Sequence, residues 1–193
     1  MRPAEKNKAL TCIIGGGASG LAAACVLTQA GLPFVLLEKE SRPGRKLLAT
    51  GNGRCNLMNV SDPVFFGDDG FARQVLAACP VAAVSEFFER IGLAWFVEEQ
   101  GRAYPLSRQA ATVLDSLMSV IAQAPDGRVL TDCRVNALEP GARGFEVRTA
   151  AGDSLTAARV IACSGSPAAP RLGGGDSLMP LLTRLGHRLV PFT

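Results

Sequence analysis

The chain has 193 residues, 48% of them hydrophobic, which is enough to bury the core of one domain with or without an elaboration. Its 20 basic and 17 acidic residues give a formal net charge of +3, a balance too even to predict nucleic acid or an anionic membrane as a partner. None of the six cysteines forms a C-x-x-C pair, so the sequence predicts neither a metal site nor a redox dithiol. We expect reduced thiols in a cytoplasmic protein.

An uncharged run from residue 9 to residue 37 follows three cationic side chains, and its length suits an export signal or a membrane span. Glycines at 15–17 interrupt the run, and Gly31-Leu32-Pro33 breaks it again. The run therefore divides into a strand, a helix and a second strand. We expect no membrane or export segment here.

These three elements predict a βαβ unit. Residues 9–14, ALTCII, are a short apolar run suited to a buried parallel strand. Residues 18–30 are helix formers followed by Gly31, a natural end for a helix. Residues 34–38, FVLLE, predict a second buried strand that ends in an acid. This order predicts an α/β fold of the Rossmann type.

The turn between the first strand and the helix carries the pattern G-x-G-x-x-G. Gly15 permits the tight turn, Gly17 lets a diphosphate approach the backbone, and Gly20 lets the helix and strand pack closely. Glu38 follows Gly20 by 18 positions, where a carboxylate accepts hydrogen bonds from the adenosine ribose and disfavours a 2′-phosphate. Free amides and a partial positive charge at the helix start suit the phosphates, and these amides belong to Gly17, Ala18 and Ser19. The pattern predicts a dinucleotide site.

The later elements decide between NAD and FAD. Helical patterns follow at 70–79, 81–91 and 108–123, with an extended piece at 94–98. Short alternating stretches then follow at 128–139, 144–150 and 153–165, with turn signals between them. We predict an antiparallel β-meander in place of a crossover helix, followed by the apolar strand RVIACSG. This arrangement is similar to the FAD domain of glutathione-reductase-type flavoproteins and favours FAD.

Residues 44–56, GRKLLATGNGRCN, concentrate three glycines, three cationic side chains and two asparagines. Glycine lets the backbone approach another molecule closely, and Arg and Lys donate to anionic oxygens. We interpret the stretch as a loop that touches a ligand. A solvated turn would have the same composition.

Five stretches in this order resemble the bacterial BaiN-like family of FAD-dependent flavoproteins, which includes aminoacetone oxidases: IIGGGASGLAAA, GRKLLATGNGRCNLMNV, RAYPLSRQAATVLDSL, VIACSGSPAAPRLGGGDS and LGHRLVPFT. The resemblance implies that residues 44–56 lie along the flavin end of FAD, with Arg45 and Lys46 near phosphate or flavin oxygens. Positive charge from Arg54 or Lys46 would stabilise the anionic reduced flavin. The family usually has A-T-G-G where this chain has ACSGS, so Ser164-Gly165 would form the turn beside the cofactor. The candidate cofactor-binding residues are Gly15, Gly17, Ala18, Ser19, Gly20, Glu38, Lys39, Gly44, Arg45, Lys46, Gly51, Asn52, Gly53, Arg54, Cys55, Asn56, Val135, Ser164, Gly165 and Asp176.

The resemblance implies an oxidoreductase that transfers a hydride or electrons between FAD and a small organic substrate, with NAD(P)H as a possible transient donor. Members of the family continue beyond the equivalent of residue 193 into an inserted substrate domain and then complete the FAD domain. We therefore expect residues 1–193 to be the first segment of that domain. The alternatives are a non-catalytic dinucleotide-binding fragment that needs a partner segment, and an NAD-binding dehydrogenase domain. The catalytic residues and the oligomeric state stay open.

Four residues invite a catalytic interpretation that we do not favour. Cys55 lies in the block at 44–56, and we expect a packing cysteine rather than a reactive thiol. His187 is the only histidine, and we expect it to cap or pack a helix end. Trp95 and Tyr104 flank a predicted hairpin, and we expect them in its core or rim rather than stacked on a flavin.

Overall fold

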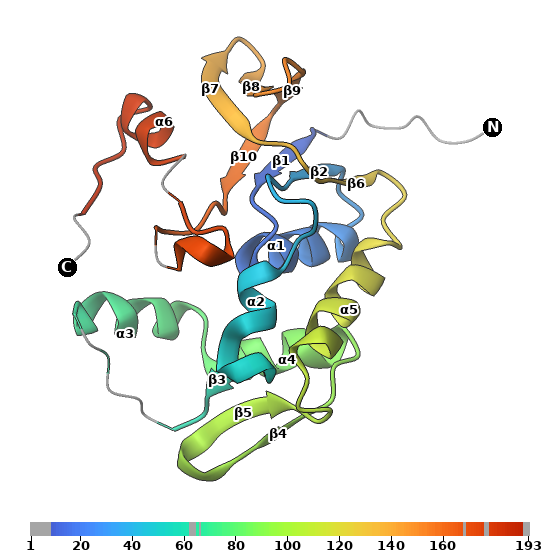
Figure 1. Cartoon of the computed structure of the whole chain (residues 1–193), viewed down its shortest axis with the longest axis vertical. Coiled ribbons are helices and arrows are strands. Elements are labelled where there is room, and N and C mark those ends of the chain that lie inside the picture. The colour runs from blue at the N-terminus through green and yellow to red at the C-terminus, as the bar shows by residue number, and fades with distance from the viewer. Residues whose placement is uncertain (1–8, 62–64, 66, 168, 176–177, 191–193) are drawn as a thin grey trace. The chain divides into compact units, whose positions relative to one another are not determined.

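The computed structural model describes residues 9–61, 65, 67–167, 169–175 and 178–190, and this part of the chain forms two compact units (Figure 1). Unit 1 holds the residues up to 46 together with 118–190, and unit 2 holds residues 47–117. Asp176, which the sequence adds to the candidate site, lies outside the described residues.

Unit 1 is built on a parallel sheet of four strands in the order β10-β1-β2-β6. The strands are β1 (Thr11–Ile14), β2 (Phe34–Leu37), β6 (Gly127–Leu130) and β10 (Arg159–Ala162). All three pairings are parallel, and every residue of the two central strands is buried. Helix α1 (Ala18–Gln29) connects β1 to β2. The predicted βαβ unit and Rossmann-type fold are confirmed.

An antiparallel meander connects β6 to β10, as predicted. Its strands are β7 (Val135–Gly141), β8 (Gly144–Thr149) and β9 (Ser154–Ala157). The prediction of one meander strand over 128–139 is wrong, because Gly127–Leu130 pairs with β2 in the parallel sheet. The reason is that β6 is an edge strand whose exposure alternates along its length, and this alternation has the same period as a half-exposed antiparallel strand.

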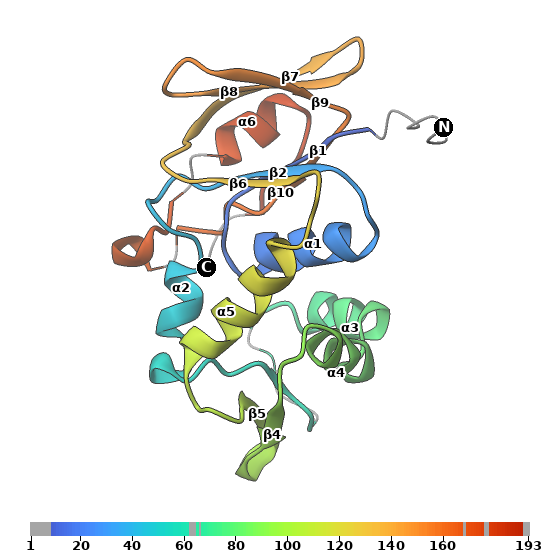
Figure 2. The same cartoon turned by 90° about the vertical axis from the view of Figure 1, so that its right-hand side faces the viewer.

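The two faces of the parallel sheet are covered by different elements (Figure 2). Helix α1 packs against β1 and β2 on one face, with Leu21, Ala24 and Cys25 buried. On the other face, side chains of β1 and β2 form one apolar cluster with the meander and with Leu181 of α6 (Met179–Arg184). Successive residues of a strand point to opposite faces, so a strand buried on both faces is apolar throughout. This is why TCII and FVLL contain no charge.

Unit 2 contains a small antiparallel sheet in the order β3-β5-β4. Strands β4 and β5 form the predicted hairpin, with Phe96 opposite Tyr104. The helices and strands of this region are α2 (Arg45–Ala49), the 3-10 turn η1 (Thr50–Gly53), β3 (Met58–Asn59), α3 (Asp69–Ala78), α4 (Val81–Arg90), β4 (Trp95–Val97), the 3-10 turn η2 (Glu99–Gly101), β5 (Arg102–Pro105) and α5 (Ala110–Ile121). Helix α2 starts in unit 1 and α5 ends there.

The expectation of a loop throughout residues 44–56 is wrong for its first half. Residues 45–49 form the helix α2, because RKLLA contains only good helix formers between Gly44 and Thr50. Only after Thr50 does the chain adopt the irregular backbone that the glycines indicated.

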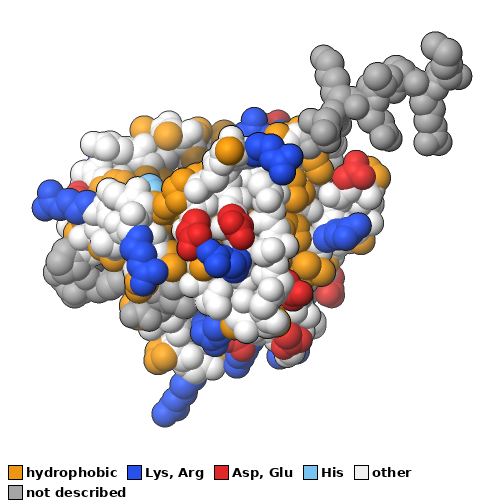
Figure 3. Space-filling model, turned by 90° about the horizontal axis from the view of Figure 1, so that it is seen from above, with side chains coloured by type: hydrophobic (Ala, Val, Ile, Leu, Met, Phe, Trp, Pro, Cys, Tyr) orange, Lys and Arg blue, Asp and Glu red, His pale blue; other side chains and the backbone are white. Residues whose placement is uncertain are grey.

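In the described part of the chain, no single helix is long and apolar enough to cross a membrane. Helices α3 and α4 reach the length and apolar composition of a membrane span only when taken together, and they are bent by 51° relative to one another. On the face seen in Figure 3, basic and acidic side chains are interspersed with hydrophobic ones.

Candidate functional site

The glycine-rich turn after β1 has the geometry that its pattern predicts. Gly15 has φ of +109°, and a Cβ atom on it would lie 2.3 Å from the carbonyl oxygen of Cys163. A Cβ atom on Gly20 would lie 1.9 Å from the carbonyl oxygen of Gly15. Both positions therefore require glycine. Gly15 needs it for the positive φ of the turn and for the close approach of the segment after β10, and Gly20 needs it for the close packing of α1 on the turn.

Gly17 differs from these two glycines, because a Cβ atom on it would meet nothing within 4 Å. It is the N-cap residue of α1, and no side chain caps this helix end. Within the described residues, the amides of Gly17, Ala18 and Ser19 have no hydrogen-bond partner, and Ala18 and Ser19 are exposed. An uncapped helix start of this kind is suited to an anion, since free N–H donors and the helix dipole both favour negative charge.

Glu38 follows β2 at the same edge of the sheet and is 8% exposed. Its Oε2 accepts a hydrogen bond from the Gly16 amide at 2.6 Å, and its Oε1 accepts one from the Glu40 amide at 2.8 Å. Two backbone amides therefore fix the carboxylate beside the glycine turn. An ionised carboxylate offers about four acceptor positions, so Glu38 keeps acceptor capacity on both oxygens. The predicted contact with a ribose would use these remaining acceptor positions.

Three segments of unit 1 meet at the glycine turn. The Gly44 amide donates to the carbonyl oxygen of Gly16 at 2.8 Å, which places the start of α2 beside the turn. On the β10 side, the Cys163 carbonyl packs against Gly15, as described above. Lys46 links the two flanking segments, because its Nζ donates to the carbonyl oxygen of Ser166 at 3.1 Å.

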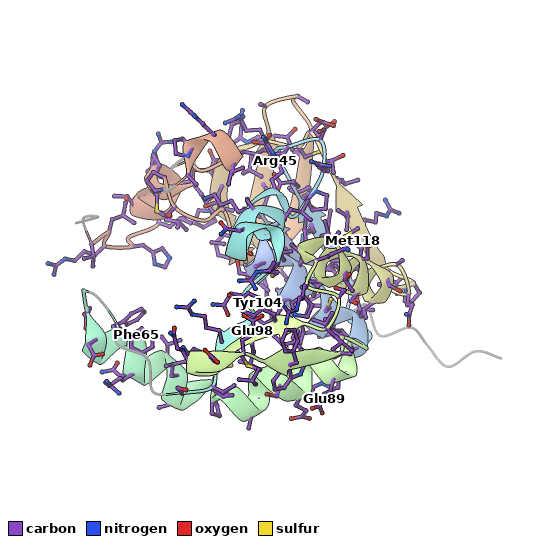
Figure 4. All side chains as sticks on the ribbon, turned by 60° about the horizontal axis from the view of Figure 1, so that its bottom comes forward. Arg45, Phe65, Glu89, Glu98, Tyr104 and Met118 are labelled. Carbon is purple, nitrogen blue, oxygen red and sulfur yellow. The ribbon has the colours of Figure 1, made fainter. Side chains whose placement is uncertain are left out.

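Arg45, labelled in Figure 4, lies beside Lys46 and forms an ion pair with Glu40. Its Nη2 also donates to the carbonyl oxygen of Arg171 at 3.3 Å. Lys39 lies 4.0 Å from the same Glu40 carboxylate. The cations predicted for a ligand are therefore engaged with protein oxygens in this structure.

The second half of the block at 44–56 belongs to unit 2. Its backbone is left-handed at four positions, Gly51, Asn52, Gly53 and Cys55, with φ between +54° and +82°. Two of these residues are not glycine, and such residues rarely adopt positive φ, so the surrounding structure must impose this conformation. Asn52, Gly53 and Asn56 are exposed.

Arg54 in this block is held by unit 2 itself. Its guanidinium lies 4.3 Å from the centre of the Tyr104 ring, and its Nη1 lies 3.3 Å from Oε1 of Glu98. Glu98 and Tyr104 lie close together on the hairpin in Figure 4. Tyr104 is buried and Trp95 is half-buried, as expected for core and rim residues. Arg108 also pairs with Glu98, at 3.4 Å.

Two candidate residues are buried in ways that favour packing. Val135 belongs to the apolar cluster under the meander. Cys55 is buried, and burial raises the pKa of its thiol, with a hydrogen bond to Thr50 acting in the opposite direction. A raised thiol pKa lowers the fraction of reactive thiolate, which supports the expectation of a packing cysteine.

The structure adds partners that the sequence analysis missed: Gly16, Glu40, Ser166 and Arg171 around the glycine turn, and Glu98 beside Arg54. Gly16 carried a signal, because it stands inside the glycine pattern as an extra glycine. The Ser166 and Arg171 carbonyls carried none, since any residue supplies a carbonyl oxygen.

Residues 9–193 match the family model described as the HI0933-like protein Rossmann domain. The chain belongs to this family. Over 185 residues it is 40% identical to the 3-dehydro-bile acid delta(4,6)-reductase of Clostridium scindens, covering 93% of this chain and 44% of that protein. It is 27% identical over 195 residues to the ribosomal RNA dihydrouridine synthase of Escherichia coli K12, covering 94% of this chain and 47% of that protein. The predicted family resemblance is confirmed.

Among solved structures, the chain is similar to the 3-ketosteroid-delta4-(5alpha)-dehydrogenase of Rhodococcus jostii RHA1, with a TM-score of 0.64 and 15% identity. The match covers 97% of this chain and 56% of that enzyme. At this identity the likeness concerns the fold. The HI0933-like chain spans about half the length of the curated relatives that it matches.

Proposed function

We propose that this member of the HI0933-like family binds FAD, with the diphosphate at the start of α1 and the adenosine ribose on Glu38. The observation that carries the proposal is the uncapped start of α1: three amides without a partner in the described chain, beside a Gly17 that has open space where a side chain would be. A diphosphate needs both close approach to the backbone and several N–H donors.

Glu38 supports a dinucleotide rather than a simple phosphate. Its carboxylate is fixed by the Gly16 and Glu40 amides at the same turn and keeps free acceptor positions for hydroxyl groups. Its negative charge would repel a 2′-phosphate, so NADP is disfavoured at this position. We expect the turn at Ser164-Gly165 to lie beside the cofactor.

We further propose that the protein is an FAD-dependent oxidoreductase acting on a small organic substrate, with NAD(P)H as a possible electron donor. The 40% identity to a bile acid reductase supports this class of reaction. Bound FAD would supply the transfer of a hydride or of electrons, and the residues of this chain would hold and orient it.

A second candidate is a dinucleotide-holding segment that needs further polypeptide for activity. This candidate is supported by the coverage of the curated relatives, 44% and 47% of their lengths. The two candidates share the FAD site and differ in turnover. Supplying the remaining half of a relative, and assaying NAD(P)H oxidation with and without it, separates them.

The test of the shared site is the visible flavin absorption of the purified chain, followed by titration of the stripped protein with FAD, NAD and NADP. We expect FAD to bind, and Gly17→Val and Glu38→Ala each to abolish its retention. Glu86→Ala is the matched control, because Glu86 is exposed and, in the part of the chain that the structure describes, forms an i,i+4 ion pair with Arg90. Flavin content that is unchanged in both site variants would refute the assignment.

A further inference from the structure

The segment after β10 has little regular structure of its own in the part that is described. Within residues 163–167 and 169–172, which we call the post-β10 loop, the only regular element is the 3-10 turn η3 (Pro170–Leu172). The Leu172 amide donates to the carbonyl oxygen of Ala169 at 3.0 Å inside the loop, and the Cys163 amide ties the start of the loop to the carbonyl oxygen of Ile14 in β1 at 2.8 Å. Contacts from elsewhere in unit 1 therefore contribute to its position.

Two adjacent cations at the start of α2 make such contacts. Lys46 donates from Nζ to the carbonyl oxygen of Ser166 at 3.1 Å, and Arg45 donates from Nη2 to the carbonyl oxygen of Arg171 at 3.3 Å. Lys46 and Ser166 are 120 positions apart in the sequence, and Arg45 and Arg171 are 126 positions apart. Charged donors form stronger hydrogen bonds to carbonyl oxygens than neutral donors do.

Each cation is itself held in place. Arg45 pairs with the Glu40 carboxylate, and both side chains are about two-thirds buried. Lys46 follows on the same short helix, and the Gly44 amide anchors the start of that helix to the Gly16 carbonyl. The cations therefore project from a segment that is already attached to the glycine turn.

The loop reaches the candidate site directly. The Cys163 carbonyl lies against Gly15, and a Cβ atom on Gly165 would lie 3.7 Å from Nζ of Lys46. A displacement of the loop would therefore move the residues that pack against the glycine turn, next to the uncapped start of α1.

We propose that Lys46 and Arg45 are positioning residues that clamp the post-β10 loop beside the glycine turn. They act on the dinucleotide through this loop rather than by contact with its phosphates. The effect on FAD rests on the function proposed above, whereas the clamp itself does not require FAD.

Limited trypsin digestion of the protein without FAD tests the clamp, because the loop contains a cleavage site after Arg171. We expect Lys46→Met to raise the rate of cleavage after Arg171 about fivefold, the effect of losing one partly exposed charged hydrogen bond. Lys46→Arg keeps a charged donor, and we expect it to restore the slow rate. Arg128→Met, an exposed substitution on β6, is the matched control.

Cleavage after Arg184 in α6 is the internal reference, because it rises only if unit 1 opens more widely. Unchanged cleavage after Arg171 in Lys46→Met would overturn the clamp, and so would an equal rise at both sites. FAD titration of the same variants is the second measurement: we expect weaker binding for Lys46→Met and normal binding for Lys46→Arg. Faster loop cleavage with unchanged FAD affinity would overturn the positioning role, and weaker affinity with unchanged cleavage would indicate direct phosphate contact instead. If the unsubstituted protein binds no FAD, the proposed function fails while the digestion still decides the clamp.

Discussion

Replacing Gly20 by alanine tests the close packing of α1 on the glycine turn. The new Cβ atom would lie 1.9 Å from the Gly15 carbonyl oxygen, and an ordinary contact needs at least 3.4 Å, so the helix must move by about 1.5 Å. Overpacking of this size costs about 3 kcal/mol, at the upper end of the usual range. The better helix propensity of alanine returns at most about 1 kcal/mol. We expect a net loss of about 2 kcal/mol in the free energy of unfolding.

Urea denaturation followed by circular dichroism measures this loss. With a denaturant slope of about 2 kcal/mol per molar, the midpoint should fall by about 1 M. Gly17→Ala is the matched control, because its Cβ atom meets nothing and its φ is −78°. Its stability should change by about 1 kcal/mol at most, the effect of a poorer N-cap residue. A midpoint for Gly20→Ala equal to that of the unsubstituted protein would refute the packing argument.

Three other predictions address the site, the core and unit 2. Glu38→Gln should weaken FAD binding at least tenfold. The glutamine side chain has one acceptor oxygen, whereas both oxygens of the Glu38 carboxylate accept hydrogen bonds from backbone amides. Equal affinity in a titration would contradict the proposed role. Burial raises the pKa of Cys12 from 9.0 to about 12, so its thiol stabilises the fold fully below pH 9 and loses that contribution as the pH rises towards 12. The stability difference between the unsubstituted protein and Cys12→Ala should therefore be constant up to about pH 8 and fall by about 1 kcal/mol at pH 10, and a constant difference would show that the thiol is not buried. Gly101→Ala should destabilise unit 2, because φ is +76° there and the Cβ atom would lie 2.1 Å from Oγ of Ser61, and hydrogen exchange should show this loss in residues 47–117 but not in β1 or β2.

The βαβ unit was predictable because its signals are local. A strand buried on both faces needs an unbroken apolar run, and the turn that follows needs glycine at defined positions. The strands β1 and β2 satisfy the first condition and the glycine turn between them satisfies the second, all within 30 positions. The same holds for the antiparallel meander, where each strand pairs with its neighbour in the chain.

Strand β6 was misassigned because its partner is distant in the sequence. It pairs with β2, almost a hundred residues earlier, and the alternating exposure of an edge strand does not distinguish parallel from antiparallel pairing. The helical conformation of RKLLA was missed for a different reason. Its neighbouring glycines and charges indicated a loop, and local helix propensity outweighed them.

The sequence by itself determined the glycine turn, the carboxylate at the end of β2 and the family to which the chain belongs, because side-chain identity and spacing encode all three. Only the tertiary structure decided which groups the cations at the start of residues 44–56 contact. Lys46 and Arg45 meet carbonyl oxygens of residues more than a hundred positions away, and Glu38 meets two backbone amides. Every residue carries a carbonyl and nearly every residue an amide, so no pattern of side chains could identify these partners before the chain was folded.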